Sequence, residues 1–190
     1  MTKYSAPTER SGHSSAPSGT ERAHTLIVLV EDRPGASDRV IGLLRRRRAN
    51  MQTFVLGRSE LPDVVRITVV VNDSEVGVDH LVEQLRKVVD VRHLEHLTEQ
   101  QAVTRELALI KVSSTATNFN EIIELGHLFG AHAVDITRET VTLEVTGNEE
   151  KVEKLVSLLQ DYGIREVARS GRVAIARGID NSVVEKLHKE

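Results

Sequence analysis

The stretch whose residue types best suit chemistry is the acidic turn Glu31-Asp32-Arg33-Pro34-Gly35. It separates the apolar run Leu26 to Val30 from an amphipathic segment, so the chain is predicted to pass from a strand through a tight turn into a helix. The first amides of a helix have no partner within it and favour a carboxylate. Asp32 lies beside them and can accept a hydrogen bond from an ammonium. The turn is therefore predicted to hold both ends of an α-amino acid, with no catalytic side chain.

The same turn also suits a purely structural role. Asp32 and Ser37 are typical capping residues, and Pro34 fixes φ at a position where no donor is needed. Gly35 lets either a ligand or another part of the backbone approach closely. The residues alone leave both interpretations open.

The run Arg45-Arg46-Arg47-Arg48 is the strongest local concentration of charge. Cations suit the carboxyl end of a helix, so the run fits a solvated helix end, and it also fits a surface that docks an acidic partner protein. Nucleic acid is a poorer partner because the net charge is −3 and the chain has no Trp, two Tyr and three Phe for stacking on bases.

No pattern typical of catalysis or metal binding occurs in the sequence. The absence of cysteine excludes disulfides, thiolate metal sites and a cysteine nucleophile. There is no GxSxG or HExxH motif, and His93 and His96, three apart on a predicted strand, point to opposite faces. We therefore expect neither catalytic residues nor a bound metal.

The composition is that of a globular protein, with 39% hydrophobic and 28% charged residues among 190. The apolar run Leu26 to Val30 is too short for a signal peptide or a membrane span. We expect a cytoplasmic protein with no membrane or nucleic-acid partner. Residues 1–22 are rich in Ser, Thr, Pro and Gly and are predicted to be a disordered tail; a cleaved transit peptide is the alternative, opposed by Glu9 and Glu21.

Hydrophobic periodicity predicts an α+β fold in which the element order β-α-β-β-α-β occurs twice, as in two tandem ferredoxin-like domains. The predicted domains are 23–99 and 105–178, followed by a polar tail at 179–190. In the second domain, Ile164 to Ala168 and Val173 to Ala176 are expected to supply one last strand. Each sheet is expected to keep one open face and unpaired edges, which favours a homodimer that covers them. The predicted strands are 24–31, 50–58, 64–71, 91–97, 106–112, 133–137 and 141–145, and the helices are 35–48, 74–89, 121–129 and 149–162.

The residues 31–57, EDRPGASDRVIGLLRRRRANMQTFVLG, resemble the ACT domain of acetolactate synthase (acetohydroxyacid synthase) small regulatory subunits. The second half is also similar to that family, and the resemblance spans residues 24–178. Its motifs lie at 105–112, 134–136, 143–147, 163–171 (GIREVARSG) and 176–178.

The resemblance implies a non-catalytic subunit that dimerises through its ACT domains and activates a thiamine-diphosphate-dependent catalytic large subunit. It also implies feedback inhibition of branched-chain amino-acid synthesis by valine. Thiamine diphosphate, magnesium and FAD would belong to the large subunit, and this chain would carry no cofactor. Valine would lie between two paired ACT domains, and Arg45 to Arg48 remain the candidate docking residues. The implied effector residues are Asp32, Pro34, Gly35, Ala36, Asn50 and Met51.

Four positions depart from the family pattern. Asp32 stands where many relatives have Asn, Ser37 replaces Leu, and Ala49 replaces an aromatic residue. Arg48 replaces a Gly, which predicts a helix end that is either regular or strained. Two alternatives remain: a stand-alone ACT sensor of another enzyme or transporter, which the GIREVARSG motif disfavours, and a ferredoxin-like hydrolase.

Overall fold

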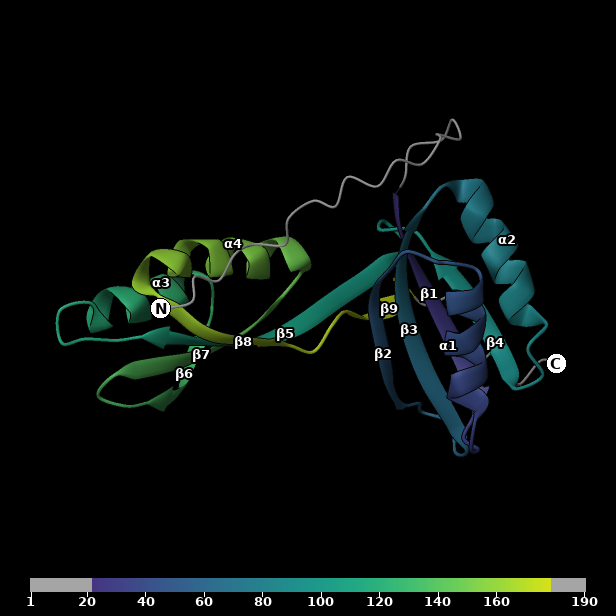
Figure 1. Ribbon diagram of the computed structural model, residues 1–190, viewed down its shortest axis with the longest axis horizontal. Helices are drawn as coiled ribbons and strands as arrows, with labels where there is room; N and C mark the ends of the chain where they lie inside the picture. Colours follow the sequence, from purple (N-terminus) through teal and green to yellow (C-terminus); the bar gives the residue numbers. More distant parts are fainter. Residues whose placement is uncertain (1–21, 179–190) are drawn as a thin grey trace.

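The computed structural model describes residues 22–178, which form two α+β units; the long strand β5 belongs to the second unit and extends to the first (Figure 1). In each unit two helices cover one face of an antiparallel sheet. The predicted fold class, two successive βαββαβ units, is confirmed. The tails predicted at 1–22 and 179–190 lie outside the described residues, except for Arg22, which begins the first strand.

The first unit has the sheet order β2-β3-β1-β4. Its helices are shorter than predicted, while Ser74 caps the second one as expected, accepting a hydrogen bond from the amide of Gly77. The elements are β1 (Arg22–Glu31), α1 (Ala36–Arg46), β2 (Met51–Arg58), β3 (Val64–Asp73), α2 (Glu75–Arg86) and β4 (Val91–Leu97).

The apolar run in β1 lacks alternation because both of its faces are buried. Leu26, Val28 and Val30 pack against the two helices. Ile27 and Leu29 lie on the opposite face and are equally inaccessible to solvent. Something other than α1 and α2 must therefore cover the second face.

The second unit has the sheet order β6-β7-β5-β8. Gly163, with φ +84°, ends its last helical segment as predicted. The elements are β5 (Ala102–Ser113), α3 (Phe119–Leu128), β6 (His132–Ile136), β7 (Thr140–Gly147), α4 (Glu149–Leu159), the 3-10 helix η1 (Gln160–Tyr162), β8 (Ile164–Arg169) and β9 (Val173–Ala176).

The prediction of a single last strand is wrong. β8 pairs with the second half of β5, whereas β9 pairs with its first four residues, Ala102 to Arg105. Between them the chain crosses to the first unit at Gly171, whose φ is +79°. A Cβ there would lie 2.9 Å from Cγ2 of Val55 on β2, so this position needs glycine to let the crossing segment approach.

The ribbon formed by β9 and the start of β5, called the β5–β9 ribbon below, covers part of the open face of the first sheet. Ala102 and Ala174 of the ribbon form a buried cluster with Ile27 and Leu97. Figure 1 shows β9 on the side of this sheet away from α1. The chain thus covers for itself part of a face that a second copy was expected to cover, while β2 remains at the edge of its sheet.

The end of α1 adopts a strained geometry. Arg48 has φ 54°, in the left-handed region that favours glycine. The amide of Ala49 donates to the carbonyl of Leu44 at 3.1 Å, and that of Arg48 to Arg45 at 3.0 Å. These two bonds form the Schellman motif, whose left-handed residue is usually Gly. Of the two expectations for this helix end, the strained one is therefore correct.

The substitution Arg48→Gly is expected to raise the free energy of unfolding by about 1 kcal/mol, because it removes the steric cost of a side chain in the left-handed region. Urea or thermal denaturation followed by circular dichroism measures the change. The matched control Arg47→Gly, at φ −82°, should lower stability instead. Equal effects of the two substitutions would contradict the assignment of strain to Arg48.

Candidate functional site

The acidic turn leads into α1 without a side-chain cap. Gly35 occupies the N-cap position with φ +82°, and no side chain there accepts a hydrogen bond from the helix. The amide of Asp32 donates to the carbonyl of Asp63 at 2.8 Å, which ties the turn to the loop between β2 and β3. The predicted capping of the helix by Asp32 and Ser37 is therefore wrong.

Two helical amides at this end remain available. Within residues 22–178, the amide of Ala36 donates to the carbonyl of Arg33, but those of Ser37 and Asp38 donate to no protein group. Together with the positive end of the helix dipole, such amides favour a carboxylate. The geometry of the turn is thus that of a small anion site.

A buried carboxylate holds the turn in place. Asp90, just before β4, has no solvent-exposed side-chain surface. Its Oδ1 accepts from Nη2 of Arg33 at 2.5 Å and from Nη2 of Arg39 at 2.8 Å, and Nε of Arg39 contacts Oδ2. The amide of Glu31 also donates to the Asp90 carbonyl at 3.0 Å. The end of β1, the first turn of α1 and the start of β4 therefore meet at one residue.

The electrostatics of this cluster favour the ionised carboxylate. Hydrogen bonds from Arg39 and then Arg33 outweigh the cost of burial and lower the pKa of Asp90 from its ordinary 3.8 to about 2. The same bond raises the pKa of Arg39. Two guanidinium groups on one carboxylate are a strong charge-assisted arrangement.

Sequence reasoning missed Asp90. The apolar pattern predicts a helix through Val89, whereas α2 ends at Arg86 and Val89 is 77% exposed. The available signal was the placement of Asp90 between Val89 and Val91, where a carboxylate interrupts an apolar stretch at the start of a strand. Its partners Arg33 and Arg39 lie more than fifty residues away in the chain, and hydrophobic periodicity does not register such pairings.

The six predicted effector residues lie in two groups, at opposite ends of the first sheet. Asp32, Pro34, Gly35 and Ala36 gather at the end of the sheet where β3 begins. Asn50 lies beside the other end of β3, where its carbonyl accepts from the amide of Asn72 at 3.0 Å, and Met51 pairs with Val71. Because β3 spans ten residues, these two ends are roughly 30 Å apart. One chain alone does not bring the two groups together.

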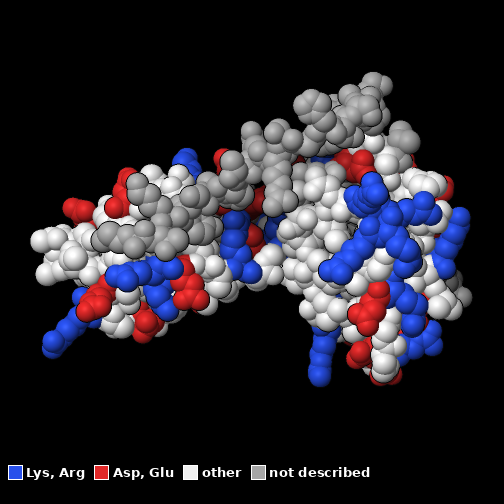
Figure 2. All heavy atoms as spheres, viewed as in Figure 1, with Lys and Arg blue, Asp and Glu red and all other residues white. Residues whose placement is uncertain are grey.

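The four arginines at Arg45 to Arg48 are all exposed. Figure 2 shows basic side chains gathered over the region of α1. Arg47 donates to the side chain of Gln84 at 3.0 Å, and Arg45 and Arg46 occupy the last turn, where cations suit the dipole. This placement suits both a solvated helix end and a docking surface, so the docking prediction stays a prediction.

The histidines follow the predicted geometry. On β4, His96 pairs with Leu26 and His93 with Leu29, on opposite faces of the sheet. Nδ1 of His24 lies 2.9 Å from Nε2 of His96. In the described part of the chain, no three His, Cys, Asp or Glu side chains are grouped as metal ligands. Across the same residues, no helix is both long and apolar enough to cross a membrane.

The pairing of Asp90 predicts a pH dependence of stability. Because its pKa is lower in the folded protein than the ordinary 3.8, its contribution is complete above about pH 4 and is lost as the pH falls toward 2. Asp90→Asn should therefore lower the urea midpoint at neutral pH. Between pH 4 and 2, the midpoint of this variant should fall less steeply than that of the wild type. The exposed Asp79→Asn serves as control and should keep the wild-type slope. A wild-type slope in Asp90→Asn would contradict the role given to this carboxylate.

Both halves of the chain match models of one protein family. Residues 26–93 match the AHAS small subunit-like ACT domain, and residues 105–178 match the small subunit of acetolactate synthase. The chain is 44% identical to the acetolactate synthase small subunit of Mycolicibacterium smegmatis, over 82% of this chain and 91% of the relative. It is 42% identical to that of Bacillus subtilis, over 80% and 90%.

A solved structure agrees with these matches. The crystal structure of the acetolactate synthase small subunit from Thermotoga maritima superposes with a TM-score of 0.78 at 32% identity, covering 83% of this chain and 99% of that one. The resemblance predicted from the sequence is confirmed in both halves. This chain therefore belongs to the acetolactate synthase small-subunit family, with an ACT domain in its amino-terminal half.

Proposed function

We propose that this chain is a non-catalytic regulatory subunit that binds the catalytic large subunit of acetolactate synthase and raises its activity in branched-chain amino-acid synthesis. The proposal is supported by curated relatives that are named as small subunits of this enzyme and are matched over nine-tenths of their length. In this proposal thiamine diphosphate, magnesium and FAD are held by the large subunit. This chain contributes the effector site and the contacts that transmit its state.

We further propose that valine is the effector and binds at the acidic turn. The observation that carries this proposal is the start of α1, where uncapped amides are held in place by the bonds of Arg33 and Arg39 to Asp90. The valine carboxylate would accept from the amides of Ser37 and Asp38, and Asp32 would accept from the ammonium. A carboxylate at position 32 accepts from an ammonium without the amide donor that Asn supplies in many relatives.

A homodimer would complete this site. The turn lies at the same end of the sheet as the end of β2, because Asp32 bonds to Asp63 and Arg58 pairs with Val65. Asn50 lies at the opposite end. If two copies pair their β2 edges antiparallel, as a two-fold requires, the start of β2 in one copy meets the turn end of the other. This arrangement places Asn50 and Met51 of a second copy at the end of the sheet where the guest would bind.

Reconstitution tests the regulatory function. With pyruvate as substrate, the chain alone should form no acetolactate, and the catalytic subunit should become several times more active and valine-sensitive when the chain is added. Stimulation is expected because the chain contributes binding contacts to the large subunit. An absence of any effect on the catalytic subunit would favour the stand-alone ACT sensor. Turnover of an acyl phosphate by the chain alone would favour the hydrolase.

Calorimetry tests the effector site. The wild type should release or absorb heat with valine. Gly35→Ala should weaken binding about tenfold or more, because a side chain at φ +82° costs about 1–3 kcal/mol of strain, which the free turn relieves by leaving the conformation that binds valine. The added Cβ would also lie 3.3 Å from Nη1 of Arg39. Gly57→Ala is the control, because a Cβ there meets nothing within 4 Å. No heat from the wild type with valine, leucine or isoleucine would refute the site.

A further inference from the structure

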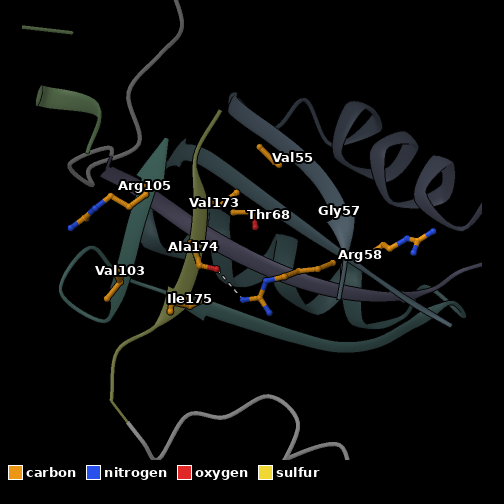
Figure 3. Close-up of a pocket in the computed structure, with 10 residues that line it drawn as sticks. Val55, Gly57, Arg58, Thr68, Val103, Arg105, Val173, Ala174 and Ile175 are labelled. Atoms are coloured by element: carbon orange, nitrogen blue, oxygen red, sulfur yellow. Dashed lines mark hydrogen bonds between the residues drawn. The ribbon is translucent and has the colours of Figure 1, made fainter. Parts of the chain in front are cut away.

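A groove separates the β5–β9 ribbon from the open face of β2 and β3 (Figure 3). Its volume is about 370 Å³. One wall comes from the first sheet and the other from β5 and β9, so residues more than a hundred positions apart build it together. The lining residues are Val55, Gly57, Arg58, Arg66, Thr68, Val103, Arg105, Val173, Ala174 and Ile175.

The larger side chains of β9 line this groove. Ala174 faces the first sheet and is 3% exposed, which lets the ribbon lie close to Ile27. Val173 and Ile175, which alternate with Ala174 along β9, are 50% and 59% exposed and line the groove. With Val55 and Val103 they make the centre of the groove aliphatic. Neighbouring half-exposed aliphatic side chains are typical of an interaction surface.

The polar groups around this centre carry one sign of charge. Three arginines line the groove, and none of its ten lining residues is acidic. Arg66 is fixed by a bond from its Nη2 to the carbonyl of Ala174 at 2.9 Å. Figure 3 shows Arg58 and Arg105 on opposite sides of the groove, with their side chains extending away from its centre. An aliphatic centre with a basic rim complements an aliphatic segment that has acidic flanks.

We propose that the groove binds a segment of the catalytic large subunit that presents aliphatic side chains flanked by Asp or Glu. This inference rests on the proposed regulatory function and names the surface through which it acts. A second copy of the chain is a poorer occupant, because a two-fold contact centred on the groove would bring Arg58, Arg66 and Arg105 against the same three arginines.

The decisive variant is Ile175→Glu, which puts a carboxylate in the aliphatic centre. Binding of the wild type and variant to the intact catalytic subunit is measured by titration, together with the concentration that gives half-maximal activation. Ile175→Glu should raise both the dissociation constant and that concentration about tenfold or more. The matched control is Ile136→Glu, since Ile136 is also on a short strand and is 55% exposed. It should bind as the wild type does.

Charge reversal provides a second measurement. The double variant Arg58→Glu, Arg105→Glu should weaken binding and reduce its salt dependence. The matched control Arg138→Glu, Lys154→Glu, at exposed cations of the second unit, should leave both unchanged. Arg45→Glu, Arg46→Glu tests the other candidate docking surface. Valine calorimetry on every variant reports whether the ACT domain has kept its fold.

Three outcomes would overturn the proposal: groove variants that bind like the wild type, loss of binding only on reversal of Arg45 and Arg46, or Ile175→Glu that dissociates the homodimer without weakening large-subunit binding. If the wild type itself neither binds nor activates the catalytic subunit, the proposed regulatory function fails instead, so the two failures are distinguishable.

Discussion

The charged contact between Asp90 and the two arginines, Arg33 and Arg39, is the interaction on which the candidate site depends. A carboxylate without solvent exposure is costly to keep ionised unless charged donors satisfy it, and here two guanidinium groups do so. Because one arginine lies in the turn and the other in α1, the pairing fixes both relative to β4. The uncapped amides of α1 are consequently held in place before a ligand binds, which lowers the entropic cost of binding.

The return of the chain through β9 is the second constraint. In a plain tandem of two ferredoxin-like domains, each sheet would be completed by its own residues. Here the first sheet obtains part of its cover from β9, which comes from the far end of the described chain, and Gly171 is the position that allows the crossing. The two units therefore share a small buried cluster, formed where the β5–β9 ribbon packs on the first sheet, and this cluster opposes their independent movement.

Features encoded by neighbouring residues were predictable from the sequence. The strand at Leu26 to Val30, the Ser74 cap and the helix end at Gly163 each follow from local pattern and were confirmed. The pairing of Asp90 was not predictable, because its partners are distant in the chain. The position of β9 was missed for a related reason: the pattern Val-Ala-Ile-Ala suits a strand in either sheet, and only tertiary packing selects its partner. For the same reason, sequence spacing did not reveal that Asn50 lies far from Asp32.

Both the proposed valine site and the groove use residues of β2, and this has a thermodynamic consequence. Met51, near the proposed guest, and Val55, in the groove, are four residues apart on one strand, or about 13 Å. If valine bound at one end of β2 alters the position of the strand, the free energy of binding the large subunit at the groove must change with it. Thermodynamic linkage is reciprocal for equilibrium binding. If valine changes the affinity for the large subunit by some factor, a large subunit bound in the groove changes the affinity for valine by the same factor. The affinity for valine would then differ between the assembled enzyme and the isolated chain.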